Sequence, residues 1–272
     1  MKKFTPTEYD IEMSEGIAEE YEKYECNRRS PKETFEHWQS QRPCMVFKYR
    51  GIDTEANLSR AIDIFEKARL FFPKASSLND PFEGGNVNFL SDEDDKDKER
   101  FRQRIGNTRI LSLSKDCFSA PLWAHYASEG NGICIGFHTY ESFSSIQKLG
   151  YSNTIDKKQF WSVDIDDAVK NEYCWKNKDW SYENEYRILK EVSDDENEDY
   201  FCFSSKEILT VIFGENVKPV DKKSLLKCIP KNCVIFDIKA DKNRARYYLI
   251  QDDFPENKIY ELDELYDAVI KE

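Results

Sequence analysis

Trp180-Ser181-Tyr182-Glu183-Asn184-Glu185-Tyr186-Arg187-Ile188-Leu189 is the stretch around which the rest of the chain is organised. Its residues predict a β-strand, whose side chains alternate between two faces, so that Glu183, Glu185 and Arg187 share one face. Two carboxylates about 7 Å apart on a strand repel each other, and burial raises their pKa values unless a cation lies close. Arg187 is the candidate cation. The stretch predicts either a solvated face with an ion pair or two acids directed into a cleft.

The composition indicates a folded protein without the signature of a nucleic-acid binder or a membrane protein. The 272 residues include 18 Phe, 15 Tyr and 5 Trp but only 10 Gly, as in packed globular chains. The net charge of −12 argues against a general nucleic-acid binding surface, although a few local cations could still hold such a substrate. No apolar run reaches the length of a membrane span, and the N-terminal residues lack a signal-peptide core. We therefore expect a cytoplasmic protein that does not contact membranes.

The cysteines and histidines indicate no metal site. The eight cysteines form no Cys-x-x-Cys pair, and most of them lie in apolar runs. This pattern predicts reduced thiols in the core rather than a disulfide framework or zinc ligands. The three histidines are scattered along the chain, so we expect no bound metal.

The order of predicted elements indicates an α+β fold. Residues 1–42 have the pattern of acidic helices and form a predicted N-terminal helical arm. Residues 43–272 mix short strands and helices without an internal repeat, which predicts a single α+β domain. Strands are expected at 44–50, 69–73, 109–114, 132–137, 148–151, 159–163, 200–203, 208–213, 234–238 and 246–250, and helices at 54–67, 120–128, 166–175, 222–229 and 261–271.

A tight turn is predicted at Asn79-Asp80-Pro81-Phe82-Glu83, because Asn and Asp before Pro favour a turn that hydrogen-bonds to itself. We expect Phe82 to anchor this loop on the body of the protein. The alternative is that Asp80 or Glu83 lines a cleft.

Three short motifs follow one another in a suggestive order: Arg50 at the end of a predicted strand, Ser112-Leu113-Ser114 within another strand, and Glu183-Asn184-Glu185. This order resembles the arginine, serine-x-serine and glutamate-x-glutamate motifs of one class of mono-ADP-ribosyltransferases. The resemblance covers residues 44–190. It implies an ADP-ribosyltransferase-like fold, with mixed sheets around a cleft that binds NAD as the substrate. The acceptor would be a protein or a nucleic acid that the sequence does not identify.

The resemblance also implies a role for each motif residue. Glu185 would bind the ribose 2′-hydroxyl near the bond that breaks, and Glu183 would face the acceptor group as a polarising group or a base. Arg50 would contact the phosphate or ribose of NAD. Ser112 and Ser114 would hold the nicotinamide ribose and the strand pair. Each of these three residues also has an ordinary structural interpretation. Arg50 can pack its aliphatic part against the strand end with its charge in solvent, and Ser112 and Ser114 can be ordinary half-buried hydroxyls.

Aromatic residues and one histidine complete the predicted site. Tyr49, Trp123 or Tyr126 could stack on nicotinamide. Arg187, a cation, is also expected to contact NAD. His125 is either an acid–base group beside the catalytic glutamate or a neutral core histidine with one hydrogen bond.

A second resemblance spans residues 46 to about 250. The segments that carry it are Asn79–Glu83, Ser112–Ser114, Leu122–Ala127, Gly132–Phe137 and Trp180–Arg187. Together they are similar to the bacterial domain-of-unknown-function family 2971 (DUF2971). That family has no settled biochemical role, so the resemblance assigns the motifs to one domain without assigning chemistry.

The sequence therefore leads to one expected function and two alternatives. We expect an NAD-dependent ADP-ribosyltransferase-like enzyme, of the kind used as a bacterial defence or toxin-type effector. The absence of a Gly-rich phosphate loop argues against a Rossmann or P-loop enzyme. One alternative is a non-catalytic sensor module that binds a nucleotide or peptide, for instance in phage defence. The other is a metal-dependent nuclease or hydrolase that uses Asp80, Glu83, Glu183 and Glu185.

Overall fold

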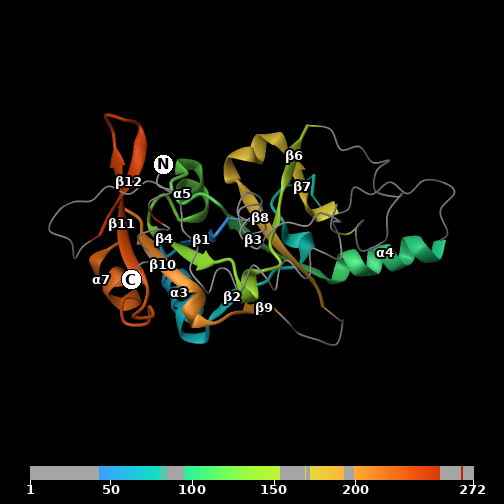
Figure 1. Cartoon of the computed structure of the whole chain (residues 1–272), viewed down its shortest axis with the longest axis horizontal. Coiled ribbons are helices and arrows are strands. Elements are labelled where there is room, and N and C mark those ends of the chain that lie inside the picture. The colour runs from blue at the N-terminus through green and yellow to red at the C-terminus, as the bar shows by residue number, and fades with distance from the viewer. Residues whose placement is uncertain are drawn as a thin grey trace, which may run out of the picture. The chain divides into compact units, whose positions relative to one another are not determined.

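The computed structural model describes residues 43–80, 82–83, 95–153, 169, 172–192, 199–251 and 265. Its largest feature is a mixed eight-stranded sheet. The strand order is β12 (Arg246–Ile250), β11 (Val234–Asp241), β10 (Ile208–Phe213), β4 (Gly132–His138), β1 (Met45–Gly51), β3 (Thr108–Ser114), β8 (Glu185–Glu191) and β5 (Gln147–Lys148) (Figure 1). β10 and β11 pair in parallel, and the other neighbours pair antiparallel.

Shorter elements accompany this sheet. Two strand pairs lie outside it, β2 (Arg69–Phe71) with β9 (Tyr200–Cys202) and β6 (Gly150–Ser152) with β7 (Trp175–Asn177). The helices are α3 (Glu55–Lys67), α4 (Asp95–Asn107), α5 (Ala120–Tyr126) and α7 (Pro219–Leu225), with 3-10 turns η1 (Ala75–Ser77), η2 (Glu141–Phe143), η4 (Lys178–Glu183) and η5 (Ser205–Glu207). This mixture of strands and helices confirms the predicted α+β class. No helix in the described ranges is long and apolar enough to cross a membrane.

Local sequence signals explain why α3 forms where it was predicted. The Thr54 side chain accepts a hydrogen bond from the Asn57 N–H at 3.2 Å and caps the helix. At the other end Ala68 has a left-handed backbone with φ of 46°, which stops the helix. Between these ends the stripe that includes Ile64 and Phe65 is buried.

Apolar side chains cover both faces of the sheet. Since neighbouring residues of a strand face opposite ways, Val46 belongs to one core cluster and Phe47 to the other. The first cluster packs the sheet against α3 and α7. The second packs it against α5 through Leu122 and Trp123. The strands are therefore held in place from both sides, and their polar side chains can be fixed in a buried setting.

The sheet is almost divided between β1 and β3. β1 pairs with β4 along its whole length, from Met45 to Gly51, and β3 pairs with β8 from Thr108 to Ser114. Within these fully described strands, β1 and β3 share a single pair of Cα partners, Phe47 and Ser114. The transferase resemblance implies two small sheets around a cleft. The structure differs, because it has one large sheet with an opening at this position.

The stretch 180–189 does not form one continuous strand. Residues up to Glu183 form the η4 turn, which the Asn177 side chain caps by accepting the Asp179 N–H at 2.9 Å. Asn184 then adopts a left-handed backbone with φ of 44°, a conformation that Asn tolerates better than most residues. β8 begins only at Glu185. The predicted strand alternation across Glu183 is therefore wrong, and a turn positions this residue instead.

Other element predictions differ in their bounds or cannot be compared. The predicted strand 148–151 is interrupted at Leu149, and its two parts belong to β5 and β6. α7 begins at Pro219, earlier than the predicted 222, because proline fits the first helical turn. The predicted N-terminal arm 1–42, the strand 159–163, half of the segment 166–175 and most of the segment 261–271 lie outside the described residues.

Candidate functional site

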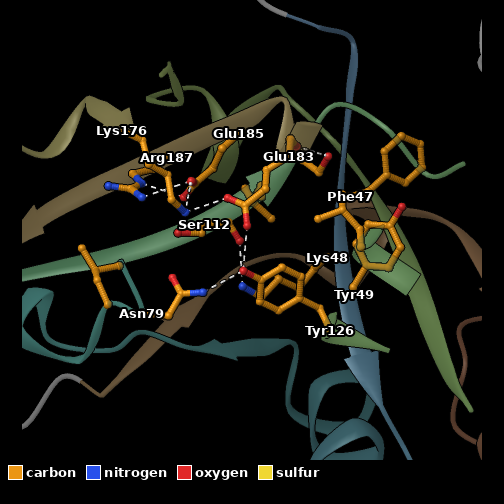
Figure 2. A pocket seen from close by; sticks show the side chains of 14 residues that line it. Phe47, Lys48, Tyr49, Asn79, Ser112, Tyr126, Lys176, Glu183, Glu185 and Arg187 are labelled. Atoms are coloured by element: carbon orange, nitrogen blue, oxygen red, sulfur yellow. Dashed lines mark hydrogen bonds and ion pairs between the residues drawn. The ribbon is translucent and has the colours of Figure 1, made fainter. Parts of the chain in front are cut away.

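A pocket of about 130 Å³ lies at the opening between β1 and β3. Figure 2 shows the side chains that line it. They come from both strands, from β8, from α5 and from the turn around Asn79. The lining residues are Phe47, Lys48, Tyr49, Leu78, Asn79, Ser112, Leu113, Ser114, Leu122, Tyr126, Lys176, Glu183, Glu185 and Arg187. Seven of the predicted site residues are among them.

Arg187 is the ion partner of Glu185, as predicted. Its Nε lies 2.6 Å from Glu185 Oε1, and its Nη2 lies 3.1 Å from Oε2 of the same carboxylate. Nη2 also contacts Glu83 Oε1 at 2.7 Å, while Nη1 donates to the Tyr173 carbonyl at 2.8 Å. Arg187 is 0% exposed and Glu185 is 4% exposed, so the interpretation as a solvated strand face is wrong.

Glu185 is held in its ionised form. Burial alone would raise its pKa, but the charges of Arg187 and Lys176 and hydrogen bonds from Arg187 and Ser112 lower the pKa to about 2. The carboxylate therefore stays negative at physiological pH. It is suited to stabilising positive charge, and it is not suited to proton transfer.

Lys176 joins the two acids of the motif. Its Nζ lies 2.7 Å from Glu183 Oε2 and 3.3 Å from Glu185 Oε2. Burial opposes the charge of this lysine, yet the neighbouring carboxylates outweigh the effect and raise its pKa. Lys176 is not among the site residues predicted from the sequence. Charge balance was the available signal, since one arginine cannot neutralise two buried acids.

A chain of hydrogen bonds connects Glu183 to the predicted turn. The Tyr126 hydroxyl donates to Glu183 Oε1 at 2.7 Å, and Asn79 Nδ2 donates to the Tyr126 oxygen at 2.9 Å. Burial and the nearby Glu183 raise the pKa of Tyr126, so the phenol remains protonated. Both oxygens of Glu183 are thus engaged, one by a phenol and one by Lys176 (Figure 2).

The two serines hold backbone segments together at the pocket wall. Ser114 Oγ donates to the Glu183 carbonyl at 2.6 Å and accepts the Asp116 N–H at 3.0 Å. The Ser112 carbonyl accepts a hydrogen bond from Lys48 Nζ at 2.7 Å, across the opening between the strands. In β8, the Glu185 N–H donates to the Tyr151 hydroxyl at 2.8 Å. These contacts fix the positions of both glutamates.

Arg50, predicted to contact NAD, is not among the lining residues. It lies two residues after Lys48 on the same face of β1, nearer the Gly51 end of the strand, where burial and the charge of Arg60 lower its pKa. Its Nε is buried without a hydrogen-bond partner in the part of the chain that the structure describes. Lys48, which the sequence analysis did not select, is the β1 cation at the pocket.

Trp123 and His125 also lie outside the pocket lining. Trp123 is a core residue, with its Nε1 bonded to the Cys117 carbonyl at 2.8 Å and its ring edge-on to Tyr49 at 5.3 Å. It presents no free face for stacking. His125 is exposed beside Tyr126, with ring centroids 6.3 Å apart, so the core-histidine interpretation is wrong.

The turn at Asn79–Glu83 forms, but its expected anchor is wrong. Asp80 Oδ1 accepts the Phe82 N–H at 2.9 Å, which is the predicted self-bonded turn. Phe82 is 60% exposed, whereas Asp80 is 1% and Glu83 8% exposed. The Glu83 carboxylate is buried against Arg187, and burial raises the pKa of Glu83. Glu83, not Phe82, fastens this loop.

The described residues do not form a metal centre. No group of three or more His, Cys, Asp or Glu side chains among them is arranged to hold an ion. The acids named for the nuclease alternative are instead engaged by Arg187, Lys176 and Tyr126 or, for Asp80, by its own turn. The described cysteines are free thiols.

Comparison with known proteins gives one match. A family model described as "Protein of unknown function (DUF2971)" matches residues 122–188. This segment contains most of α5, all of β4 and the η4–β8 turn with Glu183, Glu185 and Arg187. The match supports the resemblance to that family indicated by the motifs. No curated protein and no solved structure matches the chain.

Proposed function

We propose that the pocket binds the nicotinamide ribose end of NAD and that the protein transfers ADP-ribose to a macromolecular acceptor. One observation carries this proposal. The strands that bear the three motifs, β1, β3 and β8, are neighbours in the sheet, and Glu183 and Glu185 line the pocket where the first two separate. Ser112, Ser114, Glu183 and Glu185 of the second and third motifs are far apart in sequence yet line the same pocket, which supports a shared ligand.

The size of the pocket defines how much of NAD it would hold. A cavity needs a volume of roughly 10–15 Å³ to hold one water molecule. A pocket of about 130 Å³ therefore suits a planar ring with a sugar, and not a whole dinucleotide. Under this proposal, the pyrophosphate and the adenosine extend out through the opening.

The proposed reaction uses the two glutamates differently. The bond between ribose C1′ and the nicotinamide nitrogen breaks, and nicotinamide leaves neutral with the bonding electrons. The permanently ionised Glu185 stabilises the oxocarbenium-like ribose that develops. A hydroxyl, amine or similar acceptor group bonds to C1′ and loses its proton to Glu183. In this role Glu183 has to release Tyr126 or Lys176 as the acceptor enters.

The test is nicotinamide release from labelled NAD by the purified protein. Glu185→Gln should lower the rate by about 100-fold or more, because it removes the charge that faces the transition state. The matched control is Glu191→Gln, which makes the same change on an exposed residue of the same strand and should retain the activity.

Glu185→Gln removes a negative charge beside the buried Arg187 and can therefore destabilise the fold. Thermal melts of each variant establish whether it is folded. Glu183→Gln is the second variant, and it should reduce transfer to an acceptor more than hydrolysis of NAD. The proposal fails if the wild-type protein releases no nicotinamide, or if a folded Glu185→Gln protein releases it at the wild-type rate.

One observation favours a second candidate, the non-catalytic sensor. All four oxygens of Glu183 and Glu185 already have partners, as in a fixed binding wall. A sensor of this kind would show a higher melting temperature with NAD or ADP-ribose, and no release of nicotinamide.

A further inference from the structure

The cations around the pocket differ in how far they are already engaged. Lys176 contacts two carboxylates, and Arg187 contacts two carboxylates and a carbonyl. Lys48 contacts one neutral carbonyl, that of Ser112. An ammonium has three N–H donors, so two of those on Lys48 remain for a ligand.

We propose that Lys48 is the contact for an anionic group of the ligand and that this group binds together with a proton. The inference rests on the proposed function for the identity of the anion, which is the pyrophosphate of a nucleotide such as ADP-ribose. Lys48 then takes the position that the sequence analysis gave to Arg50. Its place in the pocket lining, with its Nζ bonded across the gap between β1 and β3 to the Ser112 carbonyl, supports this assignment.

The local charges explain why a proton is involved. Burial, followed by the charge of Arg50, lowers the pKa of Lys48 to about 7, against the opposite effect of Glu185 and Glu183. A large part of the free protein therefore carries a neutral amine at physiological pH. The charged and titratable groups that face Lys48 or line the pocket with it are Tyr49 and Arg50 on β1, Glu185 and Arg187 on β8, Glu183 on η4, Lys176 on β7 and Tyr126 on α5.

The direction of the pH dependence follows from this pKa. A bound pyrophosphate stabilises the ammonium and raises the pKa of Lys48 above its value in the free protein. Below about pH 7 the lysine is charged in both states, and binding is strongest. Above about pH 7 the ligand has to bring a proton with it, so the affinity falls as the pH rises.

The experiment is calorimetric titration of ADP-ribose into the wild-type protein from about pH 6 to about pH 9. We expect the affinity to fall by about tenfold or more over this range, with proton uptake visible as a dependence of the heat on the buffer. Nicotinamide riboside, which lacks phosphate, should bind without this dependence.

Variants separate Lys48 from other groups. Lys48→Arg stays charged, so it should bind ADP-ribose with little pH dependence, whereas Lys48→Met should bind weakly at every pH. His125→Gln is the control, because His125 is exposed beside Tyr126 and lies outside the pocket lining. This control should keep the wild-type profile.

Several outcomes would overturn the inference: no binding of ADP-ribose at any pH, equal affinity across the range, or an unchanged profile in Lys48→Arg. If the Lys48 variants do not fold, acetylation of wild-type Lys48 replaces them, and ADP-ribose should protect this amine from the reagent. Equal acetylation of Lys48 with and without ADP-ribose would contradict the proposal. If ADP-ribose binds with proton uptake but the protein releases no nicotinamide, the transferase proposal is refuted and this inference stands. If the protein releases nicotinamide but ADP-ribose binds without proton uptake, only this inference is refuted.

Discussion

Arg187 joins three parts of the chain at the wall of the pocket. It binds Glu185 on its own strand, Glu83 in the turn after η1, and the Tyr173 carbonyl before β7. A planar guanidinium can serve these acceptors at once, because its N–H groups point in fixed and different directions. Without Arg187, two carboxylates would remain buried with little compensation, which is far more costly than losing an ion pair in water.

Replacing Arg187 should therefore destabilise the protein strongly. We expect Arg187→Met to lower the free energy of unfolding by about 3–5 kcal/mol, measured by urea denaturation. Arg187→Lys should recover only a part of this loss, because a single ammonium cannot reach all three acceptors. Arg104→Met is the comparison, since it breaks a partly exposed pair with Glu191 and should cost about 1 kcal/mol or less. Equal losses for Arg187→Met and Arg104→Met would contradict this account.

At the scale of elements, the turn from η4 to β8 determines where both acids lie. It ends in Asn184, whose backbone is left-handed, and its carbonyl accepts the Lys115 N–H at 3.0 Å. This conformation reverses the chain between Glu183 and Glu185, and both carboxylates then contact Lys176. The geometry of one residue thus sets the spacing of the motif.

Substitutions at Asn184 test the importance of this conformation. Asn184→Gly should change the free energy of unfolding by no more than about 0.5 kcal/mol, because glycine adopts positive φ readily. Asn184→Val should lower it by about 1–2 kcal/mol, since a branched side chain strains this backbone. Both values come from chemical denaturation. If valine were tolerated as well as glycine, the turn would have to be less constrained than the structure indicates.

The elements with local signals were predicted well. The cap at Thr54 marks α3, and the apolar runs ending at Arg50 and Ser114 mark β1 and β3. The errors arose where a distant partner decides the outcome. Nothing near Glu83 in sequence indicates that Arg187 holds it inside, and so Phe82 was chosen as the anchor instead.

The same limit applies to the candidate site. Ser112 and Ser114 line the pocket with Arg187 and Glu185 because β3 and β8 pair antiparallel and bring these residues to one face. The η4 turn positions Glu183 instead. Arg50 does not line it, because it lies three residues beyond Phe47, where β1 meets β3 beside the pocket. Lys48 and Lys176 were missed, because their roles depend on the gap between β1 and β3 and on the position of β7.

At the scale of the whole sheet, the opening between β1 and β3 is the least paired junction described in it. The strands on either side are fully paired with their outer neighbours. A ligand bound in the pocket would contact both sides of this junction and restrict its fluctuations. The strands far from it, such as β11 and β12, would be unaffected.

Hydrogen exchange can measure this difference. In the free protein, the amides of β1 and β3 that point into the opening should exchange faster than those in the β4–β10 pairing. ADP-ribose at saturation should slow exchange in β1 and β3 by about tenfold, with no change in β11 and β12. Uniform slowing throughout the sheet would instead indicate global stabilisation, and no slowing would place the ligand elsewhere.

The shared position of Lys176 has a consequence for attempts to redesign this protein. A change at Glu183 that is intended to alter which acceptor is used also alters the charge that Lys176 offers to Glu185. Selectivity and folding are therefore coupled in this part of the molecule, and single exchanges will tend to disturb both. Libraries that vary Lys176 and Glu183 together keep the local charge constant, and they offer the more direct route to new specificity.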